Sequence, residues 1–160
     1  PTIIDINRSN NDLTHKDIYV NRCITSGALT SVKAWKKIDG FDEKMFIDGV
    51  DFDFCDRLIK RGFKIIQSGE VKLTHEIGHI TMRKFLWFDV CIRNHSAFRK
   101  YYIARNRVYL DKKSKKKGYP VITLLRIIKQ LILAIIYEDE KIEKIKNIFK
   151  GTYDGFKIRI

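Results

Sequence analysis

Electric charge is divided unevenly along this chain of 160 residues, and the division constrains how the chain can be organised. Residues 1–80 carry 12 basic and 12 acidic side chains, whereas residues 81–160 carry 20 basic and 7 acidic ones. The whole net charge of +13 therefore belongs to the second half. An excess of this kind is typical of a surface that meets a polyanion, such as nucleic acid, an anionic membrane or a phosphorylated substrate.

Short β-branched runs alternate with segments of helical periodicity, which predicts an α/β fold. Candidate caps for the first three helices are Ser31, Asp48 and Ser96. Strands are predicted at 2–6, 18–24, 63–67, 71–75 and 82–92, and helices at 32–38, 50–61, 96–111, 120–137 and 141–150, with a basic linker at 112–118 and a tail at 151–160.

The hydrophobic fraction of 44% suffices for a buried core. Three widely spaced cysteines form no CxxC pair, so a reducing cytoplasm fits best: Cys23, Cys55 and Cys91. The chain begins at Pro1 without a basic-then-apolar leader. We therefore expect no signal peptide and a piece cut from a longer protein.

Residues 121–136 are nearly all apolar, with a narrow polar stripe formed by Thr123, Arg126, Lys129 and Gln130. Sixteen residues that include two cations are too short and too charged to cross a membrane. Five lysines lie next to this segment, in residues 112–117. Together they predict a helix in the plane of an anionic membrane surface, while burial against a missing half or a dimer partner explains the pattern equally well.

Seven of the 19 acidic residues fall between positions 39 and 56. A solvated loop followed by helix N-terminal acids would account for this cluster. Asp51 has a more specific chemistry available, because it lies in the first turn of the helix beside free backbone N–H groups. A carboxylate held there could accept a proton from an alcohol nucleophile. Asp53, two positions further, points elsewhere.

The segment His75-Glu76-Ile77-Gly78-His79 matches the H-E-x-x-H pattern of zinc proteases. Strand-forming residues surround it and Gly78 weakens a helix, so the protease interpretation is disfavoured. At the end of a strand, His75 would offer a single imidazole beside the acidic helix. It could then complete a metal site with carboxylates supplied elsewhere.

The order of these motifs resembles the second half of the catalytic domain of family 2 glycosyltransferases. The segments 46–65, 93–96 and 101–106 are most similar to the bacterial rhamnosyltransferase and galactofuranosyltransferase branch. The motifs are Ser26-Gly27-Ala28, Gly40-Phe41-Asp42-Glu43, Val50-Asp51-x-Asp53-x-Cys55-x-Arg57, Gly62 and His75-Glu76-x-Gly78.

This resemblance covers residues 20–110 well and residues 150–156 loosely. It implies the second half of a GT-A-like domain in residues 1–110, a small mixed sheet with flanking helices, followed by amphipathic helices in residues 111–160. The nucleotide-sugar pocket and its D-x-D metal motif precede this part in the family. We therefore expect the fragment alone to be inactive.

The resemblance also implies an inverting, metal-dependent transferase. Asp51 falls at the position of the general base, with Val50 in place of the Glu that usually precedes it. His75 falls where the family uses a histidine to hold Mg²⁺ or Mn²⁺, with further ligands from the missing half. Gly27, Ala28 and Asp53 fall at positions expected to bind substrate.

Arginines on the helix that follows Ser96 are candidate ligands for a diphosphate. Arg99, Tyr102 and Asn106 share a face of that helix. Arg105 and Arg107 flank this face. A guanidinium can bind a diphosphate through two parallel hydrogen bonds. An amphipathic helix whose cations face water is the simpler explanation.

The expected partners are a nucleotide-sugar donor and a glycan or lipid-linked acceptor, with an anionic membrane surface and a second copy of the chain as further options. The expected location is the cytoplasm, including the cytoplasmic face of the membrane. A nucleic-acid-binding module is the alternative class, allowed by the charge and by Tyr101-Tyr102. We expect no nucleic acid, because the first half is neutral and no signature of an RNA-binding fold is present. An HExxH zinc protease is the third interpretation.

Overall fold

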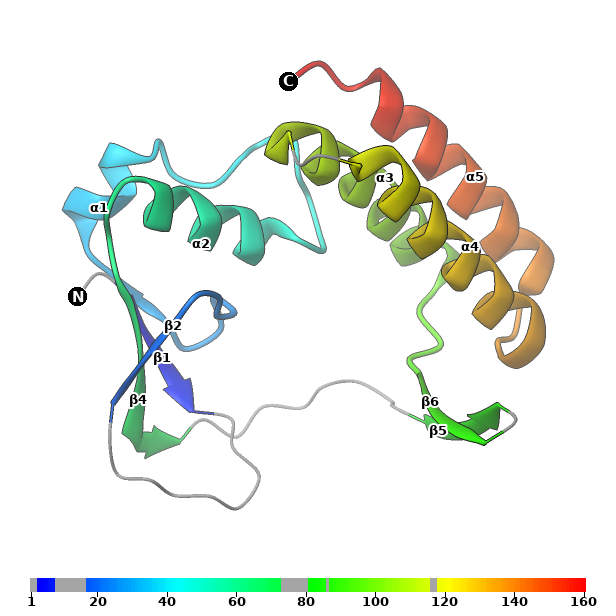
Figure 1. Ribbon diagram of the computed structural model, residues 1–160, viewed down its shortest axis with the longest axis horizontal. Coiled ribbons are helices and arrows are strands. Elements are labelled where there is room, and N and C mark those ends of the chain that lie inside the picture. The colour runs from blue at the N-terminus through cyan, green and yellow to red at the C-terminus, as the bar shows by residue number, and fades with distance from the viewer. Residues whose placement is uncertain (1–2, 8–16, 73–80, 86, 116–117) are drawn as a thin grey trace. The chain divides into compact units, whose positions relative to one another are not determined.

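The computed structural model describes residues 3–7, 17–72, 81–85, 87–115 and 118–160 (Figure 1). The chain forms two compact units. The first comprises residues 1–46 and 50–76, and the second comprises residues 47–49 and 77–160. The first combines strands with helices and the second is mainly helical, which agrees with the predicted α/β class.

A four-stranded mixed sheet and two helices make up the first unit. The strand order is β2-β4-β1-β3, with β1 and β4 parallel in the centre and an antiparallel strand at each edge. The elements are β1 (Ile3–Asn7), β2 (Ile18–Val20), β3 (Leu29–Thr30), α1 (Val32–Lys37), α2 (Val50–Lys60) and β4 (Ile65–Lys72).

The core of the first unit forms where α1 and α2 bury their apolar faces. As predicted, Ser31 caps α1, and its hydroxyl accepts a hydrogen bond from the backbone N–H of Ala34. Burial of Phe54 and Leu58, both 0% exposed, contributes roughly 1.5–3 kcal/mol each and fixes the orientation of α2. Asp51 precedes Cys55 by one helical turn on this side of α2, so the same packing places the Asp51 carboxylate. The buried cluster is Cys23, Ala34, Ile38, Phe54, Cys55, Leu58 and Ile65.

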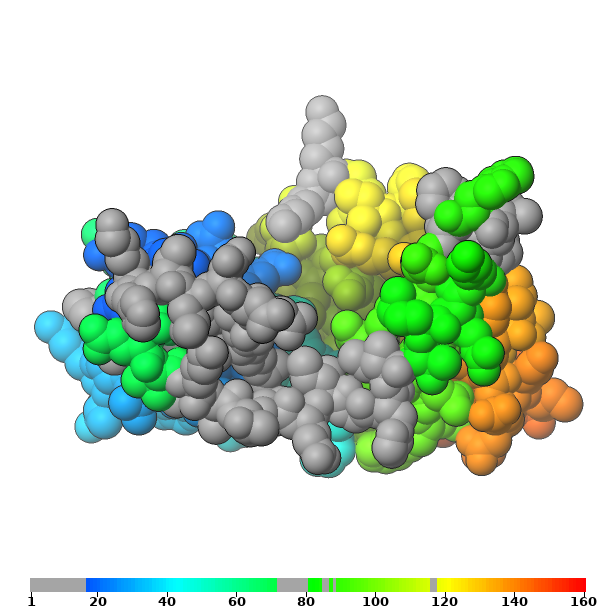
Figure 2. All heavy atoms as spheres, turned by 90° about the horizontal axis from the view of Figure 1, so that it is seen from below, coloured from blue at the N-terminus to red at the C-terminus, as the bar shows by residue number. Residues whose placement is uncertain are grey.

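A β-hairpin and three helices make up the second unit. Its core lies between the helices, where Val108, Ile127 and Ile148 are buried. The hairpin packs near the end of the second of these helices, where the Tyr137 hydroxyl donates a hydrogen bond to the Lys84 carbonyl. Figure 2 shows the hairpin in bright green beside orange helical residues of the same unit. The elements are β5 (Thr81–Phe85), β6 (Phe88–Ile92), α3 (Ala97–Ser114), α4 (Tyr119–Tyr137) and α5 (Lys141–Lys157).

Two glycines of α5 allow close contact with the backbone of α3. A Cβ atom on Gly155 would lie 2.6 Å from the Arg105 carbonyl oxygen, and one on Gly151 would overlap the Tyr101 carbonyl. The predicted tail at 151–160 is therefore wrong, because α5 continues to Lys157. Packing against α3 outweighs the helix penalty of about 1 kcal/mol for each glycine.

Other boundaries also differ from the sequence prediction. The predicted strand at 82–92 is the β5–β6 hairpin, in which Phe85 pairs with Phe88. Residues 65–72 form one continuous strand, β4, where the sequence predicts two, and β2 ends at Val20. The predicted linker begins too early, because α3 continues to Ser114 and ends at Lys115 in the left-handed conformation.

The domain boundary predicted near residue 110 stays a prediction. The two compact units divide the chain after residue 76, with α3 in the second unit. The reason is that α3 packs against α4 and α5 and contributes Ala104 and Val108 to their shared core. The segment 47–49 also belongs to the second unit, held by the buried Asn106, whose side-chain amide donates to the carbonyls of Ile47 and Asp48.

The polar side of α4 faces α3, and much of its apolar surface is exposed. Thr123, 2% exposed, donates a hydrogen bond of 2.6 Å to Asp111 of α3, and Arg126 forms an ion pair with the same carboxylate. The helix has 19 residues, so by length and composition alone it could cross a membrane, contrary to the shorter segment predicted from the sequence. The exposed apolar residues include Leu124, Leu125, Ile128, Ile132 and Ile135.

Candidate active site

The carboxylate of Asp51 is fixed at the start of α2 by hydrogen bonds from a neighbouring loop. The Thr25 hydroxyl donates a hydrogen bond of 2.6 Å to Oδ1, and the Thr25 backbone N–H reaches the same oxygen at 3.3 Å. Among the described residues, no hydrogen bond reaches Oδ2 of Asp51. A half-buried carboxylate with one oxygen anchored and the other available can act as a proton acceptor.

The loop that holds Asp51 is the one predicted to approach substrate. Its turn is closed by a hydrogen bond of 3.1 Å from the backbone N–H of Ala28 to the carbonyl of Thr25. Gly27 has a φ of +75°, a conformation that glycine adopts without the strain of a side chain. Gly27 and Ala28 therefore belong to the same turn as the residue that binds Asp51. Their contact with substrate stays a prediction.

Asp53 lies on a different side of α2 from Asp51, as the helical spacing predicts. It is 5% exposed, and its carboxylate forms an ion pair of 2.7 Å with Arg57. Arg57 also donates a hydrogen bond to the Ile38 carbonyl at 2.6 Å, which links α2 to the end of α1. These contacts are those of a structural residue, and the predicted role of Asp53 in substrate binding is untested.

Two buried cysteines connect the segment before Thr25 with the helix that carries Asp51. The sulfur atoms of Cys23 and Cys55 are 3.7 Å apart, and both residues are in the core. The hydrogen bond from Cys23 lowers the pKa of the Cys55 thiol below its ordinary value, although burial acts in the opposite direction. This contact ties the chain just before Thr25 to the middle of α2, and so helps to keep Thr25 beside Asp51.

Arg99 forms a two-pronged ion pair with Asp48 inside the second unit. Its Nε and Nη2 atoms lie 2.9 and 3.0 Å from the two carboxylate oxygens. Asp48 has a φ of +63° and does not cap α2, contrary to the sequence prediction, because its carboxylate is committed to Arg99. The guanidinium would have to leave this pair to bind a diphosphate in the predicted way. The substrate-binding role of Arg99 stays a prediction.

Arg105 supports a neighbouring residue on α3. Its Nε donates to the side-chain oxygen of Asn106 at 3.1 Å, and its guanidinium lies over the ring of Tyr102. Asn106 is 1% exposed and uses its amide nitrogen to hold the 47–49 segment. The structure thus places Arg105 in a chain of contacts within the second unit. Its predicted substrate contact is also untested.

His75 lies outside the described residues, as do Glu76 and His79 of the H-E-x-x-H pattern. The predicted role of His75 as a metal ligand beside the acidic helix therefore stays a prediction. Among the residues that the structure describes, no group of three histidine, cysteine or carboxylate side chains comes together as a metal site.

Sequence reasoning missed the roles of Thr25 and Asn106. Thr25 stands in a loop, where a hydroxyl carries no periodic signal, and only the fold brings it to Asp51. Asn106 was named only because it shares a helix face with Arg99. An asparagine is poorly suited to the interior of a helix unless it makes a specific contact, and that was the signal for its role.

Comparison with known proteins relates the chain to a glycosyltransferase. The relative is a dTDP-rhamnosyl transferase, RfbF, from Shigella flexneri, which is 28% identical over 141 residues. The match covers 84% of this chain but 45% of the relative, so the chain spans about half the length of the curated protein that it matches. No model of a known protein family and no solved structure matches the chain. The relationship supports a glycosyltransferase role in general.

Proposed function

We propose that this chain is the later part of a glycosyltransferase catalytic region, GT-A-like in residues 1–110 and extended by the helices of residues 111–160. The reaction transfers a sugar, with rhamnose as the first candidate, from a nucleotide-sugar to a hydroxyl of a polysaccharide or lipid-linked acceptor. The similarity to a rhamnosyltransferase supports the class. The observation that carries the mechanism is the Asp51 carboxylate, held through one oxygen by Thr25.

In this mechanism Asp51 removes the proton from the acceptor hydroxyl as its oxygen attacks the anomeric carbon. The bond from that carbon to the donor diphosphate breaks on the opposite side, so the configuration inverts. Thr25 keeps the carboxylate in one orientation, so less conformational entropy is lost when the reactive geometry forms. The turn at Gly27 offers backbone close to the site, where a side chain would occupy space.

A divalent cation such as Mg²⁺ or Mn²⁺, when bound, would neutralise charge on the leaving diphosphate. His75 is its proposed ligand in this chain, and the other ligands are expected from the preceding half of the protein. The proposed location is the cytoplasm, at the inner face of the membrane, where a lipid-linked acceptor would be available.

The test is Asp51→Asn in the intact protein that contains this chain. The exchange keeps the size of the side chain but removes the proton acceptor, so transfer should fall by about 10²-fold or more while donor binding stays unchanged. Asp56→Asn is the matched control, because Asp56 is on the same helix and forms an exposed ion pair with Arg22. Turnover of Asp51→Asn close to that of the control would reject Asp51 as the base.

A further inference from the structure

The side of α4 that is turned away from α3 is aliphatic and exposed to solvent. Its residues recur at intervals of three or four, so they lie along one side of the helix over about four turns. Leu125 and Ile132, near the middle of this side, are 61% and 43% exposed. A continuous aliphatic surface of this length marks a contact with a partner or with a membrane. The exposed residues are Val121, Leu124, Leu125, Ile128, Ile132 and Ile135.

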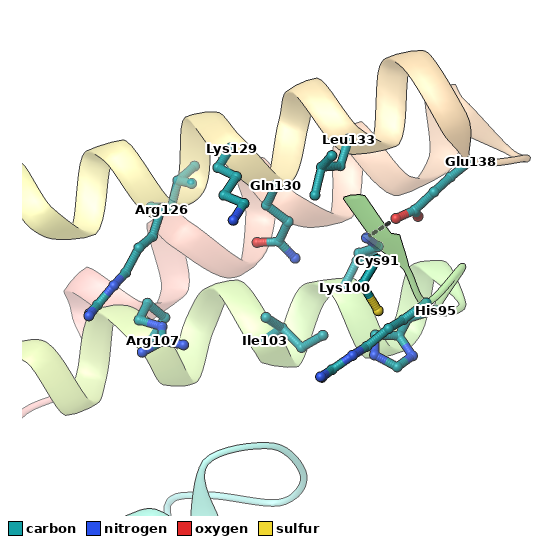
Figure 3. A pocket seen from close by; sticks show the side chains of 12 residues that line it. Cys91, His95, Lys100, Ile103, Arg107, Arg126, Lys129, Gln130, Leu133 and Glu138 are labelled. Carbon is teal, nitrogen blue, oxygen red and sulfur yellow. Dashed lines mark hydrogen bonds and ion pairs between the residues drawn. The ribbon is translucent and has the colours of Figure 1, made fainter. Parts of the chain in front are cut away.

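The opposite, polar side of the helix is held by α3. Figure 3 shows Arg126, Lys129 and Gln130 on the side of α4 that is turned toward α3. Arg126 forms an ion pair of 3.2 Å with Asp111, and the Thr123 hydroxyl donates a hydrogen bond of 2.6 Å to the same carboxylate. These contacts fix the rotation of α4 about its own axis, so its aliphatic residues are presented outward as one surface.

The β5–β6 hairpin extends this surface at the end of α4. A groove of about 620 Å³ between β6 and α4 is lined mainly by aliphatic residues, among them Val90 and Ile128. The hydrogen bond from the Tyr137 hydroxyl to the Lys84 carbonyl holds the hairpin at this end of the helix. Trp87 stands in the turn of the hairpin and is 88% exposed. Tryptophan is enriched where a membrane meets water, because its ring is apolar and its N–H is polar.

Positive charge lies at the start of α4. Residues 112–117 include five lysines, and α4 itself contains no acidic residue. Lys112 donates hydrogen bonds to two backbone carbonyls, which do not neutralise its charge, and Lys115 is exposed. The acidic residues 138–140 follow the other end of the helix, where the hairpin carries Trp87. A basic segment that adjoins an aliphatic surface is complementary to anionic lipid head groups.

A lipid bilayer suits this surface better than a protein partner does. The outward side of α4 consists of aliphatic residues alone, whereas protein interfaces are enriched in aromatic residues and arginine and form hydrogen bonds. Hydrocarbon chains require no hydrogen bonds. If α4 crossed the bilayer, Arg126 and Asp111 would lie in hydrocarbon. In the plane of the membrane surface, the same ion pair stays on the water side of the helix.

We propose that the second unit binds the surface of an anionic lipid bilayer, with α4 lying in the plane of the interface. The aliphatic side of α4 enters the acyl chains, the basic segment 112–117 meets the head groups, and Trp87 anchors the far end. The proposal rests on the membrane location of the proposed function and gives it a contact surface. This surface belongs wholly to the second unit, so vesicle binding is measured without sugar transfer and stands or falls separately from Asp51.

The test is flotation of the full chain with vesicles of phosphatidylcholine alone and of phosphatidylcholine with about one quarter phosphatidylglycerol. The anionic vesicles should bind the chain at least about tenfold more strongly than the neutral ones. Alkaline carbonate should release the bound chain, as it does a protein at the membrane surface. Absence of flotation, or equal binding to both kinds of vesicle, would overturn the proposal. Resistance to carbonate would indicate a spanning helix and would overturn the in-plane arrangement.

Variants of the aliphatic side test whether α4 makes the contact. Leu125→Asn combined with Ile132→Asn should weaken binding to anionic vesicles by about tenfold or more, because two side chains lose their transfer into hydrocarbon. Val32→Asn is the matched control, since Val32 is 67% exposed in the first unit. Equal losses for the double variant and the control would overturn the proposal. A dimer in the absence of vesicles that the double variant dissociates would show that a second copy covers α4 instead. Circular dichroism verifies the fold of each variant.

Fluorescence tests the place of the hairpin. Trp35→Phe leaves Trp87 as the only tryptophan of the chain. Its emission should shift to shorter wavelength when anionic vesicles are added, because the exposed ring moves from water into the membrane interface. Unchanged emission from vesicle-bound protein would overturn the placement of Trp87 at the membrane.

Discussion

The hydroxyl of Thr25 lies 2.6 Å from Oδ1 of Asp51 and donates a hydrogen bond to it. The two residues are 26 positions apart in the sequence, and the packing of Cys23 against Cys55 holds their segments together. The candidate base is therefore positioned by a loop as well as by its own helix. Disturbing the loop should change the reaction without removing the base.

Thr25→Val should lower kcat for sugar transfer by about tenfold in the intact protein, because the carboxylate of Asp51 loses the shorter of its two hydrogen bonds, keeps only the backbone one, and retains its charge. Thr25→Ser keeps the hydroxyl and should restore most of the activity. Steady-state kinetics with both variants provide the measurement. A kcat for Thr25→Val equal to that of the unmodified protein would show that the hydrogen bond has no part in positioning the base.

Glu138 is the shared partner of Lys100 and Lys144, and all three side chains are buried. Glu138→Gln leaves two buried ammonium groups without a counter-charge, so it should reduce the free energy of unfolding by about 3–5 kcal/mol. Urea unfolding followed by the helical circular dichroism signal provides the measurement. Glu143→Gln removes an exposed carboxylate from the first turn of α5 and should cost less than about 1 kcal/mol.

Additional removal of one lysine tests the reason for that loss. Glu138→Gln combined with Lys144→Met should recover part of the stability, because one uncompensated charge disappears. If the double variant were less stable than Glu138→Gln alone, shape rather than charge would explain the contribution of Glu138.

Gly155 lies where α5 crosses α3 at close range, and a Cβ atom there would lie 2.8 Å from the Cβ of Val108. Gly155→Ala should therefore destabilise the second unit by about 1–3 kcal/mol, although alanine favours a helix more than glycine does. Chemical unfolding checks this expectation. Lys150→Ala, at an exposed position of the same helix, should change stability by less than about 0.5 kcal/mol. A more stable Gly155→Ala variant would show that the helices can move apart freely.

Local signals predicted much of the fold because they depend on neighbouring residues. The cap at Ser31 and the cap at Ser96 are both observed, and the helical spacing of Phe54, Cys55 and Leu58 predicts α2 correctly. The C-terminal part of α5 was not predicted, because its two glycines disfavour a helix locally and are explained only by their close contact with the backbone of α3. Long-range packing, which the local pattern does not contain, decides such cases.

The same distinction applies to the candidate site and to α4. Asp51 could be selected from its place in a first helical turn, but its partner Thr25 is set by tertiary structure. The polar stripe of α4 can be recognised in the sequence, but the sequence does not show which neighbouring element the stripe faces. The stripe faces α3, where Asp111 binds Thr123 and Arg126, and apolar residues of α4 are therefore left on the exposed side.

His95 should titrate below its ordinary pKa, because burial and the nearby charges of Arg99, Lys100 and Arg93 disfavour its protonated form. The sign follows from linkage: the unfolded chain binds the proton at a higher pH than the folded chain does. The contribution of His95 to the free energy of unfolding is therefore largest above the unfolded-state pKa of about 6.5. It falls as the pH drops from there through the lower pKa of the folded state. NMR titration of the His95 ring, with His95→Gln to assign the resonance, measures this value. A pKa of the folded-state His95 ring at or above its ordinary value would contradict the effect of burial.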